Sequence, residues 1–120
     1  GGPLPARAAR LAAAVAGRGD SAWRADAERI AGVPAPGAAA PPTYGELAVT
    51  GVALVEALAT DGRWDEAAGQ ARHLTRFFTA ERRRLSPVAG HAFDGLQAAA
   101  IARDPDELRD FADLVREMFG

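Results

Sequence analysis

The chain has 120 residues, a formal net charge of −2 and no cysteine. Its length fits one domain, the lack of cysteine excludes a disulfide framework and a thiolate metal site, and the slight acidity speaks against a general nucleic-acid binder. All 14 basic residues are arginine and 30 residues are alanine, a bias that we interpret as that of a bacterium with a high-GC genome. No apolar run approaches the ~18 residues of a membrane span, so we expect a cytoplasmic protein that contacts no membrane.

The first 31 residues predict a helical hairpin. Apolar residues recur at helical spacing from about Ala6 to Gly17 and again from Ser21 to Ala31. Asp20 or Ser21 can cap the second of these helices. Trp23 is either a core residue, which we favour, or a half-exposed anchor for a partner. Because the chain opens with Gly1 and no methionine, we expect an excised domain of a larger protein.

Residues 32–43 contain four prolines in twelve positions. Each proline lacks a backbone donor and restrains the residue before it, so this stretch predicts a semi-extended linker. It is the best candidate for a boundary between the first hairpin and the rest of the domain.

Residues 44–120 predict two further hairpins. Thr43 and Glu46 have the spacing of a capping box. The apolar stripe of the first helix that follows comprises Tyr44, Leu47, Gly51, Leu54, Val55 and Leu58, and that of the second comprises Trp64, Ala67, Ala68, Ala71, Leu74 and Phe78. We expect both stripes to be narrow seams. Ser86-Pro87 and Asp104-Pro105 are start signals for the two helices of the last hairpin.

The segment from Leu54 to Leu74 resembles a tetratricopeptide repeat. Leu54 and Leu58 match the apolar positions of the first helix in that family, Gly62 and Trp64 match the turn, and Ala67, Ala71 and Leu74 match the second helix. The resemblance implies stacked hairpins with a groove that binds a protein or peptide. Val55 stands where the family has a small residue, and the turns at Gly19, Gly62 and Asp104 recur 43 and 42 residues apart instead of every ~34.

We therefore predict an all-α fold of five or six antiparallel helices. Two arrangements satisfy the pattern, namely a stack of tetratricopeptide-like hairpins and a compact helical bundle. No stretch alternates with period two, so we expect no sheet.

No motif predicts an enzyme or a cofactor. His73 has no carboxylate three or four residues away, and we expect it to be solvated. His91 and Asp94 share a helical face, but neither a nucleophile nor further metal ligands accompany them. A phosphate-binding loop is also absent.

The strongest functional signal is a cluster of arginines near the middle of the chain. We predict a partner-binding surface made of Tyr44, Arg72, Arg76, Arg82, Arg83 and Arg84. The planar guanidinium binds carboxylates bidentately, so an acidic segment of a protein or peptide partner is the expected ligand. Solvated faces explain the same charges, as on any helical protein.

Three functional hypotheses follow from this cluster. The first is a non-enzymatic interaction or scaffold module, whose groove lies between the Tyr44–Leu58 helix and the Arg72–Arg84 surface. The alternative is a regulatory or ligand-sensing domain of a larger bacterial protein that binds a small anion. Self-association through the acidic stripe of Asp106, Asp110, Asp113 and Glu117 is compatible with the first.

Overall fold

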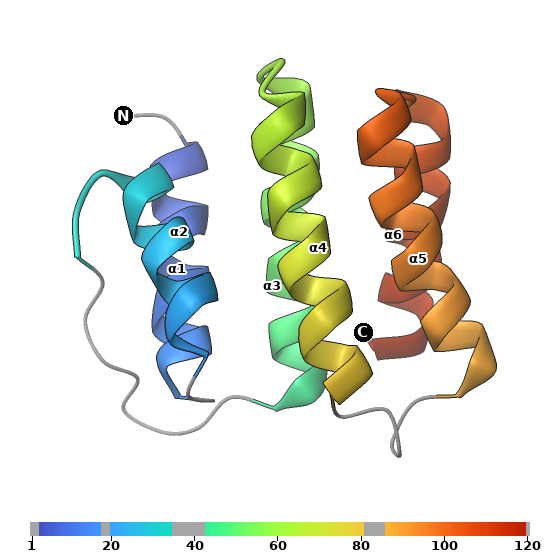
Figure 1. Ribbon diagram of the computed structural model, residues 1–120, viewed down its shortest axis with the longest axis horizontal. Coiled ribbons are helices and arrows are strands. Elements are labelled where there is room, and N and C mark those ends of the chain that lie inside the picture. Colours follow the sequence, from blue (N-terminus) through green and yellow to red (C-terminus); the bar gives the residue numbers. More distant parts are fainter. Residues whose placement is uncertain (1–2, 18–19, 35–42, 81–85, 120) are drawn as a thin grey trace.

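The computed structural model describes residues 3–17, 20–34, 43–80 and 86–119. In these ranges the chain is all helical, and consecutive helices form three antiparallel hairpins (Figure 1). The helices are α1 (Pro3–Ala16), α2 (Ser21–Ala31), α3 (Tyr44–Thr60), α4 (Trp64–Ala80), α5 (Pro87–Ala102) and α6 (Pro105–Phe119).

The predicted capping residues begin their helices. Side-chain oxygens of Asp20, Thr43 and Ser86 each accept a hydrogen bond from the backbone N–H three residues ahead, at 3.0, 3.0 and 3.2 Å. Asp104 accepts from two backbone N–H groups of α6, at 3.2 and 3.1 Å. These bonds satisfy backbone donors that have no partner inside a helix. For this reason the sequence predicts where these four helices begin.

The first helix begins earlier than the sequence predicts, at Pro3 instead of Ala6. Pro3 and Pro5 both fall in its first turn, where backbone N–H groups have no intrahelical acceptor. Proline costs little there and its fixed φ favours the helix.

The six helices form two layers. In Figure 1, α2, α4 and α5 lie in front and α1, α3 and α6 lie behind. Helices α3, α4, α5 and α6 form a closed ring in which each packs on the next and α6 returns to α3. The first hairpin attaches at the side of this ring, mainly through α1 on α3 and less through α2 on α4.

This ring distinguishes the two predicted arrangements. In an open stack of hairpins the first helix of one hairpin packs on the first helix of the next. Here α5 packs on α4 and α6 packs on α3, so the last hairpin is turned over relative to that pattern. The helices of the described residues therefore form a compact bundle. They do not form the continuous groove of a hairpin stack.

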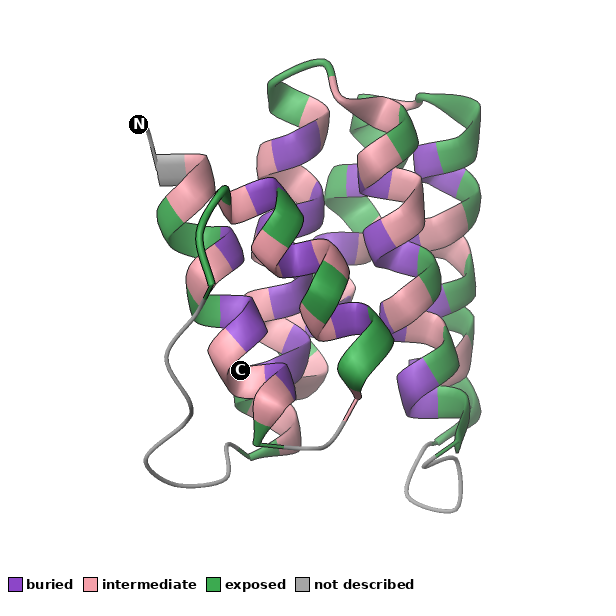
Figure 2. Cartoon of the chain, turned by 60° about the vertical axis from the view of Figure 1, so that its left-hand side comes forward, coloured by how far each residue is buried: buried purple, intermediate pink, exposed green. Residues whose placement is uncertain are grey.

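The core lies between the two layers, where the buried positions face one another (Figure 2). Its largest fully buried side chains include Trp23, Phe93, Leu11, Leu47 and Leu54. Trp23 is 0% exposed, which confirms its predicted core position.

Glycines let the helices of this bundle approach closely. A Cβ built on Gly95 of α5 would lie 2.2 Å from the ring of Phe111 in α6. A Cβ on Gly45 would lie 2.7 Å from the backbone oxygen of Phe119, where no side chain can move aside. Small residues at these two positions therefore fix how closely α6 packs on its neighbours.

Within the described ranges, no helix has the length and apolar character needed to cross a membrane. Most of the predicted linker, residues 35–42, lies outside these ranges, as do Arg82, Arg83 and Arg84 of the predicted arginine surface.

Candidate docking groove

The central helix α3 is mostly apolar, and its four polar residues lie together on one side of it, namely Glu46, Thr50, Glu56 and Thr60. Its buried residues, which include Leu47, Leu54 and Leu58, face the core. The opposite side carries Val49, Ala53 and Ala57 at spacings of four residues, and these are only partly buried. Val49, Ala53 and Ala57 form a short second apolar stripe that is bordered by these polar side chains. The buried face of α3 is broader than the narrow seam predicted, because Ala48 and Val52 are buried beside the predicted positions.

The second stripe forms the floor of a groove between α1 and α6. Three hollows of about 690, 490 and 350 Å³ follow it along α3. The first and third share Arg7 and Ala53, and the second and third share Arg10, Val49 and Thr50, so the three are continuous. At 1.5 Å per residue, the helix from Gly45 to Thr60 gives the groove a length of roughly 23 Å.

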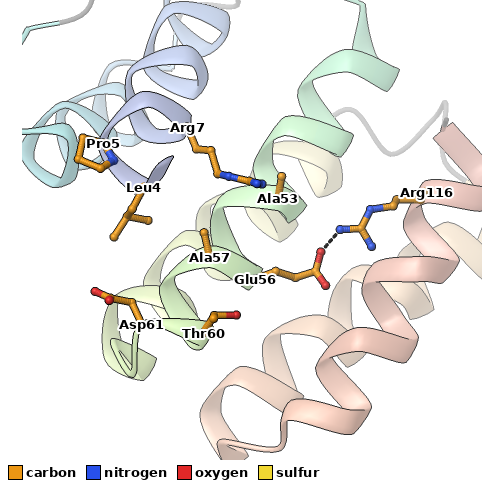
Figure 3. A pocket seen from close by; sticks show the side chains of 9 residues that line it. All are labelled: Leu4, Pro5, Arg7, Ala53, Glu56, Ala57, Thr60, Asp61 and Arg116. Carbon is orange, nitrogen blue, oxygen red and sulfur yellow. Dashed lines mark ion pairs between the residues drawn. The ribbon is translucent and has the colours of Figure 1, made fainter. Parts of the chain in front are cut away.

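Figure 3 shows the largest hollow, which all three helices of the back layer line. Leu4, Pro5 and Arg7 come from α1, and Arg116 comes from α6. The floor and the far end are formed by Ala53, Glu56, Ala57, Thr60 and Asp61. With alanine methyl groups as the floor, the backbone of an incoming segment can approach α3 closely.

The two walls of the groove differ in charge. On the α6 wall, Arg116 pairs with Glu56 of α3 and with Asp113 at 2.9 Å. On the α1 wall, Arg7 and Arg10 are exposed, and among the described residues neither makes an ion pair or a hydrogen bond. The α1 wall therefore carries two guanidinium groups without an ion-pair partner, while Asp61 and Glu46 line the two outer hollows with them.

The predicted arginine surface lies elsewhere. Arg72 and Arg76 are exposed on α4, in the front layer, whereas the groove opens on the back layer. Tyr44 packs its ring against Phe77 and Phe78, with centroids 6.2 Å away in both cases. The three hollows on α3 include neither Arg72 nor Arg76. The groove between α3 and the Arg72–Arg84 surface stays a prediction, because Arg82, Arg83 and Arg84 lie outside the described residues.

Arg76 has a partner that the sequence analysis missed. It donates a hydrogen bond to Nδ1 of His73 at 2.8 Å. Since arginine has only donors, His73 carries its proton on Nε2 in this geometry, and that nitrogen lies 2.6 Å from Asp26 Oδ2. The side chain of His73 is 12% exposed, so the prediction of a solvated, unpartnered histidine is wrong. Asp26 is 47 residues away, and no local spacing could indicate it.

Polar contacts of this kind join α2 to α4 and so hold the first hairpin on the ring. The indole N–H of Trp23 donates to Gln70 Oε1 at 2.8 Å, and the Trp23 ring stacks on His73. Gln70 is 2% exposed and is the one buried polar side chain among the described residues. These contacts set the position of α2, and through it that of the α1 wall.

A third contact between the two helices involves Glu66. Its carboxylate accepts two hydrogen bonds of 2.7 Å from Arg63 and lies 3.7 Å from Arg29 of α2. The hydrogen bonds from Arg63 lower the pKa of Glu66, and the same contact raises the pKa of Arg63. The carboxylate is thus held ionised where α2 meets the start of α4.

His91, the other histidine of the chain, packs against an aromatic ring. His91 places its ring edge-on against Phe111, at 5.7 Å. No group of three His, Cys, Asp or Glu side chains in the described ranges is arranged to hold a metal ion.

We compared the chain with family models, with curated proteins and with solved structures, and none of the three comparisons gave a match.

Proposed function

We propose that this chain is a protein-interaction module that receives a helical segment of a partner in the groove over α3. The observation that supports the proposal is the uncovered apolar stripe of Val49, Ala53 and Ala57, at the centre of the back layer. A helix laid on this stripe would contact α1, α3 and α6 together and would complete the enclosure of α3.

The shape of the groove fits a helix better than an extended strand. Strand addition needs an exposed sheet edge with free backbone donors and acceptors, whereas the backbone groups of α3 are bonded within the helix. A helical ligand instead places residues at spacings of three and four into an apolar groove. The groove, at roughly 23 Å, accommodates about four turns.

A crosslinking experiment tests this proposal. A photoreactive residue placed at Ala53 lies on the groove floor, and the same residue at Ala98 lies on the exposed face of α5 in the other layer. In an extract of the cells that make the protein, we expect Ala53 adducts with a recurring helical segment that the Ala98 variant does not capture. Adducts confined to a third variant at Arg72 would favour the α4 surface instead, and equal adducts at all three sites would contradict a defined groove.

A further inference from the structure

We infer that the partner segment is an amphipathic helix with an acidic edge, and that this edge lies along α1. The inference rests on the proposed function and adds to it the chemistry and the orientation of the ligand. It follows from the difference in charge between the two walls of the groove.

Arg7 and Arg10 are three residues apart on α1 and so lie on one face of that helix. Both line the middle hollow of the groove, and each also lines one of the outer two. In Figure 3 the side chain of Arg7 extends across the groove toward Ala53. These guanidinium groups therefore border the space that an incoming helix would occupy.

No carboxylate of the groove forms an ion pair with these two arginines in the described structure. Glu56 is taken by Arg116, which also holds Asp113. Glu46 and Asp61 line the two outer hollows and not the middle one, and neither forms an ion pair with Arg7 or Arg10 in the described structure. An occupant with carboxylates along its α1 edge would supply the missing charge, in a geometry that the guanidinium group binds bidentately.

The opposite edge of the occupant has no such requirement. On the α6 wall the charges of Arg116, Glu56 and Asp113 are already balanced locally. An acidic residue there would meet the carboxylates of Glu56 and Asp113, and a basic residue would compete with Arg116. The groove thus favours acidic residues on one edge, apolar or small residues toward α3, and neutral residues on the other edge.

The acidic stripe of a second copy does not meet these requirements. Asp106, Asp110, Asp113 and Glu117 are exposed on α6, but the apolar residues of that helix are either buried in its own core or partly buried and packed against it. An intact second copy would therefore bring carboxylates without an apolar face for Val49, Ala53 and Ala57. A separate amphipathic helix supplies both.

Two fluorescein-labelled peptides of about 16 residues, or four turns, test the inference. Both carry the same leucine and alanine face, and one edge carries glutamate in the first peptide and lysine in the second. Anisotropy titrations with the full chain should give binding of the glutamate peptide that is about tenfold tighter, since two exposed ion pairs favour it and two like-charge contacts disfavour the lysine peptide. This preference should weaken as salt is raised.

Matched variants locate the effect. Arg7→Glu with Arg10→Glu should reverse the preference, and Arg7→Gln with Arg10→Gln should abolish it without reversing it. Arg72→Glu with Arg76→Glu makes the same change in net charge on α4 and should leave the preference intact. Unchanged far-UV circular dichroism in each variant shows that the helices remain formed.

The remaining outcomes separate this inference from the proposed function. If both peptides bind equally and Ala53→Trp abolishes their binding, the groove is a docking site and the acidic edge is wrong. If neither peptide binds, the inference is overturned, while crosslinking at Ala53 decides the function independently. A dimer of the chain that Arg7→Glu with Arg10→Glu dissociates would assign the groove to a second copy and overturn the choice of partner.

Discussion

The hydrogen bond between Trp23 and Gln70 joins the first hairpin to the four-helix ring, and its removal should be costly. The indole N–H donates to Gln70 Oε1 at 2.8 Å, in a site where the two residues are 0% and 2% exposed. Trp23→Phe removes the donor and leaves the amide oxygen buried without it. An unsatisfied buried group costs roughly 1–3 kcal/mol, and the lost ring atoms add about 1–2 kcal/mol. The free energy of unfolding should therefore fall by about 2–5 kcal/mol.

A double-mutant cycle isolates the hydrogen bond from the packing of the ring. Gln70→Leu alone leaves the indole N–H unpaired, and the added apolar burial offsets part of that cost, so we expect a loss of about 1–2 kcal/mol. In the Trp23→Phe background neither polar group remains, and the same change should be nearly neutral. The expected coupling is about 1–2 kcal/mol.

Urea unfolding followed by far-UV circular dichroism measures all four members of this cycle. Far-UV detection is needed because Trp23→Phe changes the tryptophan fluorescence itself. If Gln70→Leu costs the same in both backgrounds, the hydrogen bond is energetically irrelevant, and the reasoning about how α2 is held on α4 fails.

Three further predictions concern stability. Gly95→Ala places a methyl group against the Phe111 ring and should lower the free energy of unfolding by about 1–3 kcal/mol. In contrast, Gly90→Ala on the same helix meets no atom within 4 Å and should be neutral or stabilising by up to about 1 kcal/mol. If the two variants change the free energy of unfolding equally in urea, the close packing of α5 on α6 is contradicted. Arg103 ends α5 with φ = 56°, so Arg103→Gly should raise the melting temperature, with a gain of about 0.5–1 kcal/mol, and a fall would refute strain there. Because the pKa of Glu66 is lowered from 4.5, the stability that its ionised form contributes is present above pH 4.5 and is lost as pH falls through the folded-state pKa. Glu66→Gln should therefore be less stable than the native chain at pH 7, and a deficit that persists unchanged at low pH would contradict this assignment.

The sequence is most informative where the interactions are local. Asp20, Thr43 and Ser86 act on backbone groups three residues away, and a linear pattern is enough to place them. Residues at i, i+3 and i+4 lie on one helical face, so the sequence also predicts the buried face of each helix.

The sequence does not predict how the hairpins pack on one another, because an amphipathic hairpin can pack on its neighbour in either orientation. What fixes the orientation of the last hairpin is the fit of particular surfaces between hairpins, such as Phe78 of α4 stacked on Phe93 of α5 and Gly45 of α3 close to Phe119 of α6. The partners of His73 and Gln70 lie 47 residues away on α2, and their pairing depends on how the first hairpin docks. No spacing rule connects them.

The sequence contains a weak indication of the candidate groove, next to the stronger apolar pattern of the buried face of the same helix. Val49, Ala53 and Ala57 form a second stripe on the helix that carries Leu47, Leu54 and Leu58. Small apolar residues between polar ones on a helix face are compatible both with an ordinary solvated face and with a docking face. Which of the two applies depends on the neighbours, and only the positions of α1 and α6 reveal that the second stripe is open.

Mapping by NMR tests the proposed docking groove most directly. Backbone amide chemical shifts of the full chain would be followed while the glutamate-edged peptide is added. The largest changes should fall at Arg7, Val49 and Ala53, and α4 around Arg72 and Arg76 should be little affected. Changes centred on Arg72 and Arg76, with the amides of α3 unmoved, would show that the binding surface is on the other layer and would contradict the account.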